Sequence, residues 1–283
     1  MSKERIQKAL ARQGLGSRRH IERLIEQGEI KLNDKIAQIG DQVQAGDVIL
    51  HGGRKIIIRE TTNKPPRVLM YHKPEGEVCS RSDPEGRPTI FDKLPKIHHG
   101  RWIAVGRLDI NTSGLILLTD NGELANQLMH PSSQIEREYA VRILGQVTLD
   151  TLEKITRGVE LDDGPARFEE VVDSGGKGAN HWYHVMLMEG RNREVRRIWE
   201  AVGMKVSRLM RVRYGSVIMS KSLRPGLSRE LAPKKVIELA ELAGLHYELE
   251  VLPTTTKPKI KSHKQSAKKK QGSYQRGKQT RDR

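Results

Sequence analysis

Cysteine is almost missing from the sequence, since Cys79 is the single cysteine among 283 residues. One cysteine cannot form an internal disulfide bond, and it cannot supply a cysteine-rich metal site. Structural disulfides are typical of oxidising compartments outside the cytosol. The sequence therefore predicts a reducing, cytoplasmic setting, with Cys79 as a structural residue.

Long hydrophobic runs are missing too. None approaches the roughly 20 apolar residues that a helix needs to span a bilayer. The N-terminal stretch MSKERIQKALARQ also lacks the apolar core of a secretory signal. We therefore expect neither a membrane partner nor export.

Motifs that bind common cofactors form a third absence. The chain has no P-loop and no dinucleotide fingerprint, and its histidines are scattered. The adjacent pair His98 and His99 would point apart on a helix or a strand, which disfavours a shared metal ion. We expect no small-molecule cofactor and no metal.

Acidic residues are too few to balance the basic ones, with 35 against 51 and a formal net charge of +16. Such a charge favours a polyanionic partner, with nucleic acid as the leading candidate and an anionic membrane surface as the alternative. Residues 254–283 carry eleven of the basic residues and one acid, or +10, which leaves only +6 for the rest of the chain. The folded part therefore cannot owe its specificity to bulk charge.

The C-terminal segment 253–283 is rich in Lys, Gln, Ser and Gly and has almost no apolar residues. This composition predicts a disordered tail that associates with RNA. A solubilising extension is the alternative.

An N-terminal module is predicted over residues 1–60. Ile6, Ala9 and Leu10 mark one short helix, and Ser17 can cap a second helix that ends at Gly28. Short alternating segments follow as strands. Five cations gather on and around the helices, namely Arg12, Arg18, Arg19, Arg23 and Lys31. An ordinary solvated face is the alternative to a binding surface. Residues 61–66, TTNKPP, are predicted to form a linker.

A larger domain is predicted over residues 67–252, with alternating strands and helices. The predicted strands are Arg67–His72, Trp102–Val105, Leu115–Leu118, Arg137–Leu144, Phe168–Val172, Trp182–Met188 and Ser207–Arg213. The predicted helices are Ile90–Leu94, Glu123–Met129, Leu149–Ile155 and Arg191–Val202.

The stretch Arg101–Met129 is predicted to fold as strand, turn, strand, turn and helix, with Asp109 at the mouth of the first turn. Loops held between rigid strands often carry chemistry. Taken alone, however, the stretch favours an Asp that merely accepts a turn hydrogen bond.

The segment RNREVRRIWEAV is predicted to form an amphipathic helix, with Arg191, Arg193, Arg196 and Arg197 in its first two turns. Cations near a helix N-terminus oppose the macrodipole, and such conflicts occur at functional sites. A protein carboxylate or an RNA phosphate would relieve the conflict. A solvated basic face is the alternative.

Four pieces of the chain, in this order, resemble a known family. The N-terminal Ser-Arg-Arg and EIKLND resemble an S4 RNA-binding domain. With KPEGEVCSRSDPEGRPT, GRLDINTSGLILLTDNGELANQLMHP…EREYAV and EGRNREVRRIWEAVG behind it, the chain resembles bacterial S4-containing pseudouridine synthases. The resemblance implies an α+β protein with a small helix-strand module, followed by a mixed, mainly antiparallel sheet flanked by helices.

The resemblance also implies an enzyme that detaches a uracil at its C1′–N1 bond and rejoins it through C5. It maps the catalytic carboxylate to Asp109, the base-stacking aromatic to Tyr139 and a buried guanidinium beside Asp109 to Arg196. Val195 would line the base pocket, and Arg107, Arg191 and Arg193 would contact RNA. Whether Asp109 attacks C1′ or assists a glycal route stays open.

The expected partner is ribosomal RNA, with 23S RNA or a large-subunit precursor preferred, and we expect a monomer. A synthase acting on another ribosomal uridine is the first alternative. A non-catalytic S4-type RNA-binding or assembly factor is the second. A glycoside hydrolase with paired carboxylates is the third, but nothing in the sequence brings Asp120 or Glu123 opposite Asp109.

Overall fold

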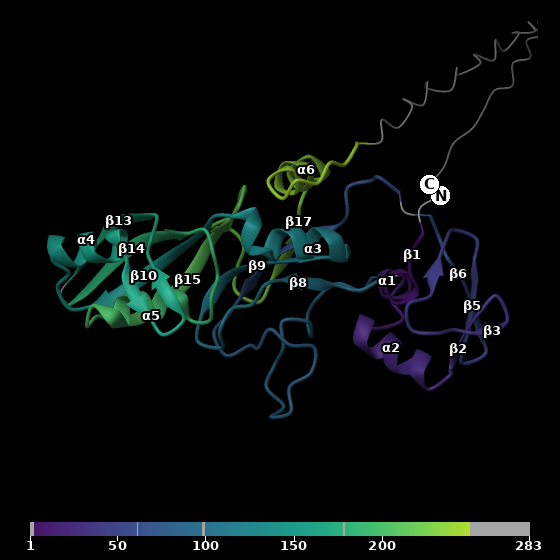
Figure 1. Cartoon of the computed structure of the whole chain (residues 1–283). Coiled ribbons are helices and arrows are strands. Elements are labelled where there is room, and N and C mark those ends of the chain that lie inside the picture. The colour runs from purple at the N-terminus through teal and green to yellow at the C-terminus, as the bar shows by residue number, and fades with distance from the viewer. Residues whose placement is uncertain (1–2, 61, 98–99, 178, 250–283) are drawn as a thin grey trace, which may run out of the picture. The chain divides into compact units, whose positions relative to one another are not determined.

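The computed structural model describes residues 3–60, 62–97, 100–177 and 179–249. The predicted tail at 253–283 and the His98–His99 pair lie outside these residues. Over the described ranges the fold is α+β with a mixed sheet, which confirms the predicted class (Figure 1). No helix in these ranges is long and apolar enough to cross a membrane.

The N-terminal module contains two helices and two small antiparallel sheets. The helices are α1 (Ile6–Arg12) and α2 (Arg18–Glu26), and the strands are β1 (Glu4–Arg5), β2 (Ile30–Leu32), β3 (Lys35–Ile36), β4 (Gln42–Val43), β5 (Val48–His51) and β6 (Arg54–Ile57). Ser17 caps α2 as predicted, because its hydroxyl accepts the N–H of His20. Ile6, Leu10 and Ile21 are fully buried in the module's core.

Residues 62–67 contain no helix or strand, and a large sheet follows. Nine strands of the described chain form it: β7 (Val68–Lys73), β8 (Ile103–Val105), β9 (Ser113–Thr119), β10 (Arg137–Leu144), β13 (Glu170–Lys177), β14 (Asn180–Leu187), β15 (Lys205–Tyr214), β16 (Val217–Ile218) and β17 (Ser228–Glu230). The order is β13-β14-β10-β15-β9-β7-β17, with β16 on β15 and β8 on β9. The β15–β9 pair is parallel and the others are antiparallel. A separate hairpin joins β11 (Val159–Leu161) and β12 (Gly164–Ala166).

Strand β9 is buried on both faces. Leu115 and Leu117 pack into one hydrophobic cluster, whereas Ile116 and Leu118 pack into another, and all four are fully buried. Burying each such side chain stabilises the fold by about 1.5–3 kcal/mol. The strand is therefore a rigid support for the loop that precedes it.

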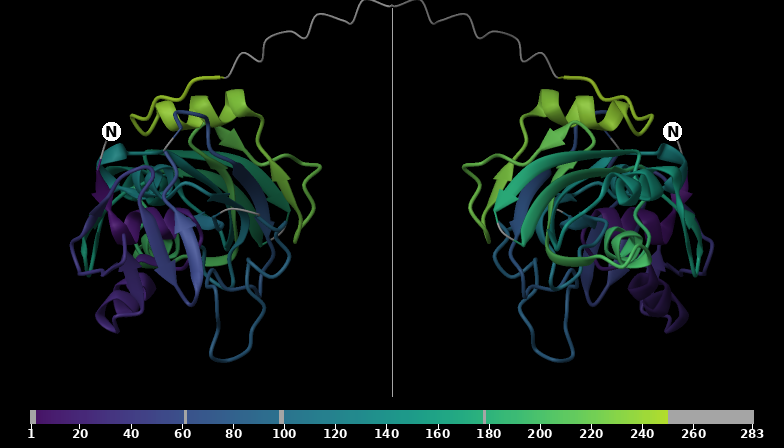
Figure 2. Two further views of the ribbon diagram at one scale, coloured as in Figure 1. Left: turned by 90° about the vertical axis from the view of Figure 1, so that its right-hand side faces the viewer. Right: turned by 90° about the vertical axis from the view of Figure 1, so that its left-hand side faces the viewer.

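Four helices and one 3-10 turn belong to this part: α3 (Gly122–Met129), η1 (Pro131–Ser133), α4 (Leu149–Arg157), α5 (Glu194–Ala201) and α6 (Pro233–Glu241). Helices α3 and α6 pack with β7 and β9, and α4 and α5 pack with β10, β14 and β15. Figures 1 and 2 show α6 at the top of the large sheet, near β17. Tyr139, Val141 and Ile143 share one buried face of β10, as their alternation predicts.

Two predictions of local structure were wrong. Ile90–Leu94 forms turns instead of a helix, because the Asp92 carboxylate accepts both the N–H and the hydroxyl of Thr89 and closes the chain there. The Arg-rich helix begins at Glu194, so Arg191 and Arg193 precede it. Helix α6, the β11–β12 hairpin and β17 were not predicted.

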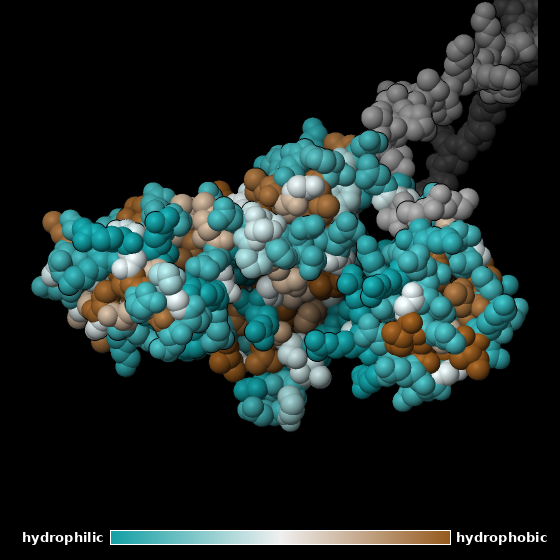
Figure 3. All heavy atoms as spheres, viewed as in Figure 1, coloured by the Kyte–Doolittle hydropathy of each residue, from teal (hydrophilic) through white to brown (hydrophobic). Residues whose placement is uncertain are grey.

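The face in Figure 3 is mostly hydrophilic, with hydrophobic areas between. This distribution agrees with a composition that is 30% charged. Specific sites must therefore be sought where charges are buried or left unpaired.

Candidate active site

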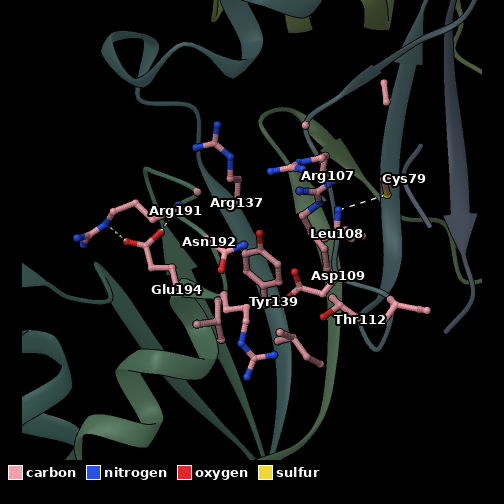
Figure 4. Close-up of a pocket in the computed structure, with 18 of the residues that line it drawn as sticks. Cys79, Arg107, Leu108, Asp109, Thr112, Arg137, Tyr139, Arg191, Asn192 and Glu194 are labelled. Carbon is pink, nitrogen blue, oxygen red and sulfur yellow. Dashed lines mark hydrogen bonds and ion pairs between the residues drawn. The ribbon is translucent and has the colours of Figure 1, made fainter. Parts of the chain in front are cut away.

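A cavity of about 890 Å³ lies at one side of the large sheet (Figure 4). Its walls come from Val78–Ser80 after β7, from Gly106–Ile110 between β8 and β9, from β10 and β15, and from Glu189–Val195 before and in α5. Six predicted site residues line it together, namely Arg107, Asp109, Tyr139, Arg191, Arg193 and Val195.

Asp109 stands in the loop between β8 and β9. Gly106 opens the loop with a φ of 80°, and the N–H of Thr112 donates to the main-chain carbonyl of Asp109 at 3.0 Å. The turn therefore does not use the carboxylate, to which no described residue donates a hydrogen bond. In Figure 4 the carboxylate points toward Tyr139. This geometry argues against a merely turn-forming Asp.

Lys73, at the end of β7, holds the Asp109 loop and was missed by the sequence reasoning. It is fully buried, and its Nζ donates to the carbonyls of Asp109 at 3.0 Å, Thr112 at 2.8 Å and, less closely, Ile110 at 3.4 Å and Pro74 at 3.1 Å. Burial lowers the pKa of Lys73, and the nearby acidic groups oppose that shift. The clue in the sequence is a Lys at the end of an apolar strand, which resembles any strand-ending cation.

Cys79 also supports this loop. Its sulfur accepts the N–H of Leu108 at 3.4 Å, and burial raises the pKa of the thiol. A neutral, half-buried thiol beside the Asp109 loop fits the predicted structural role.

Arg196 is buried, but it does not lie against the Asp109 carboxylate in the predicted way. Its NH2 donates to the carbonyl of Asn111 at 2.9 Å and its NH1 to that of Val206 at 3.3 Å. Among the described residues, no carboxylate lies within 4 Å of its guanidinium. Burial, and after it the positive charge of Arg193, lowers the pKa of Arg196, and the negative charge of Asp109 opposes that shift. Arg196 therefore connects α5 to the Asp109 loop by a hydrogen bond. It interacts with the Asp109 carboxylate only through longer-range electrostatics.

Tyr139 and Val195 face the cavity from β10 and α5, and both are buried. A buried aromatic ring facing an unpaired carboxylate, with an apolar side chain nearby, suits a planar base. Arg107 also lines the cavity, on an exposed part of the loop.

The other predicted arginines of this region are paired within the protein. Arg191 is bound by Glu194, Glu189 and Asp163, at 3.0, 3.0 and 3.1 Å. Asp163 also binds Arg197 at 2.8 Å, and Arg193 lies 3.5 Å from Glu200. Protein carboxylates thus neutralise most of the cations before and at the start of α5.

Glu194 is the buried member of that group. Burial, followed by a hydrogen bond with Glu189, raises its pKa to about 7. Its carboxylate nevertheless accepts the backbone N–H of Arg191 at 3.0 Å, and so fixes the entry to α5.

Gly114 lets β9 approach β15. A Cβ at this position would stand 2.2 Å from the main-chain oxygen of Arg211 and 2.6 Å from its nitrogen, and its φ is +107°. Only glycine fits such a backbone. The parallel pair Gly114–Arg211 therefore brings the Asp109 loop next to β15.

The carboxylates of the hydrolase alternative lie elsewhere. Asp120 follows the far end of β9, where its Oδ1 accepts the N–H of Arg67 at 3.0 Å. Neither Asp120 nor Glu123 lines the cavity. Within the described residues, no three His, Cys, Asp or Glu side chains gather as metal ligands.

Four cations of the N-terminal module are exposed, as a binding surface requires, namely Arg18, Arg19, Arg23 and Lys31. Arg12 is different, because it pairs with Glu4 and donates to the carbonyl of Arg59. Arg12 therefore stabilises the module from within.

Comparison with known proteins identifies the fold. The S4 domain model matches residues 4–49, and the RNA pseudouridylate synthase model matches residues 67–201. Ribosomal large subunit pseudouridine synthase B of Escherichia coli is 54% identical over 261 residues, which cover 91% of this chain and 87% of the relative. The chain belongs to the RNA pseudouridylate synthase family. It is therefore an isomerase, and the resemblance found in its motifs is confirmed.

Other relatives of this synthase agree. The Yersinia pestis protein of the same name is 54% identical over 247 residues, covering 87% of this chain and 78% of the relative. The Pseudomonas aeruginosa one is 51% identical over 267 residues, covering 94% and 69%. A solved structure described as a pseudouridylate synthase has a TM-score of 0.58 at 27% identity, covering 83% of this chain and 99% of its own.

Proposed function

We propose that this synthase converts one uridine of 23S ribosomal RNA to pseudouridine, at the position numbered 2605, during assembly of the large subunit in the cytoplasm. The names of the close relatives support a large-subunit substrate. We further propose that it acts as a monomer on free RNA or on a precursor particle.

In the proposed mechanism the ionised Asp109 carboxylate lies against C1′ of the ribose, where it either attacks C1′ or assists a glycal route. The C1′–N1 bond breaks, the uracil turns, and a new C1′–C5 bond forms while the C5 proton leaves and N1 gains one. Atoms and electrons balance without oxidant or reductant. Lys73 supports this chemistry by holding three carbonyls of the Asp109 loop.

Tyr139 stacks on the uracil and assists proton removal from C5, with Val195 on the other side of the base. Arg196 orients the loop through Asn111 and stabilises the carboxylate charge. A uridine stacked in a helix cannot reach this cavity, so the target base must be flipped out, at a cost of a few kcal/mol. Contacts of Arg107 and of the exposed S4-domain cations with the RNA backbone offset that cost.

The observation that carries this proposal is the Asp109 carboxylate, which faces Tyr139 across the cavity and accepts no hydrogen bond from the described protein. An Asp with a purely structural role in a turn commonly accepts hydrogen bonds from neighbouring backbone N–H groups. An unsatisfied carboxylate beside an aromatic ring is suited to a reacting nucleotide.

The Asp109→Asn variant tests the proposal. We expect conversion of a ribosomal RNA fragment to fall at least about 10³-fold, because the amide is neither nucleophile nor base. RNA affinity should stay within about twofold, because the substitution preserves shape. Pseudouridine is mapped by carbodiimide modification and reverse transcription.

Asp120→Asn is the matched control, since it changes the same residue type at the far end of β9. We expect Asp120→Asn to convert the RNA as the wild type does. If the hydrolase alternative were correct, this substitution would abolish the reaction, or free uracil would be released. Full activity of Asp109→Asn would reject the mechanism. Loss of pseudouridine from a different ribosomal position in a strain lacking the protein would reject the proposed site.

A further inference from the structure

Two buried arginines of the cavity have no part in the reaction described above. Arg137 begins β10 and is 6% exposed, and Arg211 lies in β15 and is 2% exposed. Both guanidinium groups lie 5.1 Å from the ring centre of Tyr214, which is also buried. All three residues line the cavity that contains Asp109.

Their hydrogen bonds differ in an informative way. Arg137 is largely satisfied, with its NH1 donating to the carbonyls of Ile135 and Met188 at 2.9 and 2.8 Å and its NH2 to the Tyr214 hydroxyl at 3.2 Å. Arg211 donates only its Nε, to the carbonyl of Leu115 at 2.7 Å, and its buried NH2 has no acceptor among the described residues. Most of its five N–H donors are therefore unused.

The charges are unbalanced as well. Buried cations are ordinarily paired with carboxylates, because an unpaired charge loses its hydration without compensation. Two other arginines that line the cavity are less buried and still have carboxylate partners, Arg87 with Asp83 and Arg191 with Glu194. No carboxylate of the described chain lies within 4 Å of Arg137 or Arg211. Two positive charges are thus held together around one ring without an anion.

The position of Arg211 is defined by its strand neighbours. It is the cross-strand partner of Tyr139 on β10 and of Gly114 on β9. It therefore stands between the aromatic residue proposed to stack on the base and the strand that supports Asp109. In a nucleotide, a phosphate lies one ribose away from the base, on either side of C1′.

We propose that Arg211, with Arg137 and Tyr214 behind it, binds a backbone phosphate next to the target uridine. This inference rests on the proposed function and deepens it. A phosphate supplies the missing negative charge, and its oxygens match the planar fork of a guanidinium. A neutral uracil carbonyl could accept a hydrogen bond but would leave the two charges unbalanced.

The test combines protein variants with RNAs that carry one neutral methylphosphonate linkage. The linkage is placed 5′ or 3′ of the target uridine, or at a distant control position. With the wild-type protein, one of the two flanking replacements should lower affinity about tenfold to a hundredfold. The distant replacement should lower it by less than about threefold.

Arg211→Met should weaken binding of unmodified RNA by a similar factor. Replacing the flanking phosphate by the neutral linkage should then lower the variant's RNA affinity by no more than about twofold, because the contact is already lost. Arg208→Met is the matched control, since Arg208 is exposed on the same strand. Arg208→Met should lose as much RNA affinity as the wild type when the flanking phosphate is replaced by the neutral linkage. Arg211→Lys, which retains the charge without the fork, should show an intermediate loss if Arg211→Met does not fold.

Conversion of unmodified RNA by the wild-type protein is measured first. If no ribosomal fragment is converted, the proposed function fails. If conversion occurs but neither flanking linkage matters more than the distant one, only the phosphate site fails. If the neutral flanking linkage lowers RNA affinity equally in Arg211→Met and in the wild type, the phosphate site is likewise rejected.

Discussion

At the scale of single residues, the site depends on which polar groups the protein leaves unsatisfied. Asp109 and Arg211 both face the cavity with unused hydrogen-bonding capacity. Lys73 is the opposite case, because its ammonium group has an acceptor for each N–H. We propose that the same contrast separates the residues that contact the substrate from those that hold them in position.

Lys73→Met should lower kcat by at least about tenfold while changing RNA affinity little. The methionine fills the space of the alkyl chain but leaves the carbonyl of Thr112 without its donor, and the carbonyl of Asp109 keeps only the N–H of Thr112. Each buried polar group left unsatisfied costs about 1–3 kcal/mol, so the free energy of unfolding should also fall. Single-turnover kinetics and urea unfolding measure the two effects. Lys93→Met, at an exposed position, is the control, and equal kcat values in the two variants would show that Lys73 does not position the loop.

At the scale of elements, the parallel contact between β9 and β15 decides where the Asp109 loop lies. The contact is possible because Gly114 has no side chain. The first turn of α5 adds a second restraint through Arg196 and the carbonyl of Asn111. The loop of Asp109 is thus held from two strands and one helix.

Gly114→Ala should destabilise the protein by about 2–5 kcal/mol, because the new Cβ would overlap the backbone of Arg211 and the residue would keep a positive φ. Gly164→Ala is a matched control, since Gly164 has a φ of +106° with nothing within 4 Å of its Cβ position. It carries the backbone strain without the overlap and should cost about 1–3 kcal/mol. Urea unfolding of both variants measures the difference. Equal losses would mean that the close approach of the strands is unimportant.

At the scale of the whole molecule, we propose that exposed cations bind the RNA and that the cavity carries out the chemistry. The exposed arginines of the S4 domain do not line the cavity, whereas Arg191 before α5 and Arg197 within it form ion pairs with protein carboxylates. Phosphate contacts position a protein on RNA without reading its sequence. Affinity and turnover should therefore respond to different substitutions.

The triple variant Arg18→Ala, Arg19→Ala and Arg23→Ala should weaken RNA binding and leave kcat at saturating RNA within about twofold. The slope of log affinity against log salt should become shallower by about 0.7–0.9 for each cation that contacts a phosphate. Filter binding over a range of salt concentrations measures the slope. The double variant Lys154→Ala and Arg157→Ala removes cations that are already paired with acids on α4, and it should leave the slope unchanged. A slope unaltered by the triple variant would exclude these arginines from the RNA contact.

The sequence by itself determined the family, the α+β class and the order of most elements, because apolar periodicity and motifs such as GRLD are local properties of the chain. It also led to Asp109 and Tyr139, which the tertiary structure brings into one cavity. Other features depend on contacts between distant residues, which local patterns cannot reveal. Only the tertiary structure showed that Arg191 is neutralised by carboxylates, that Lys73 holds the Asp109 loop and that Arg196 donates to a carbonyl instead of the carboxylate. The same physical reason applies to Arg211. That its buried NH2 has no acceptor among the described residues can be known only from the neighbours that the fold places around its guanidinium.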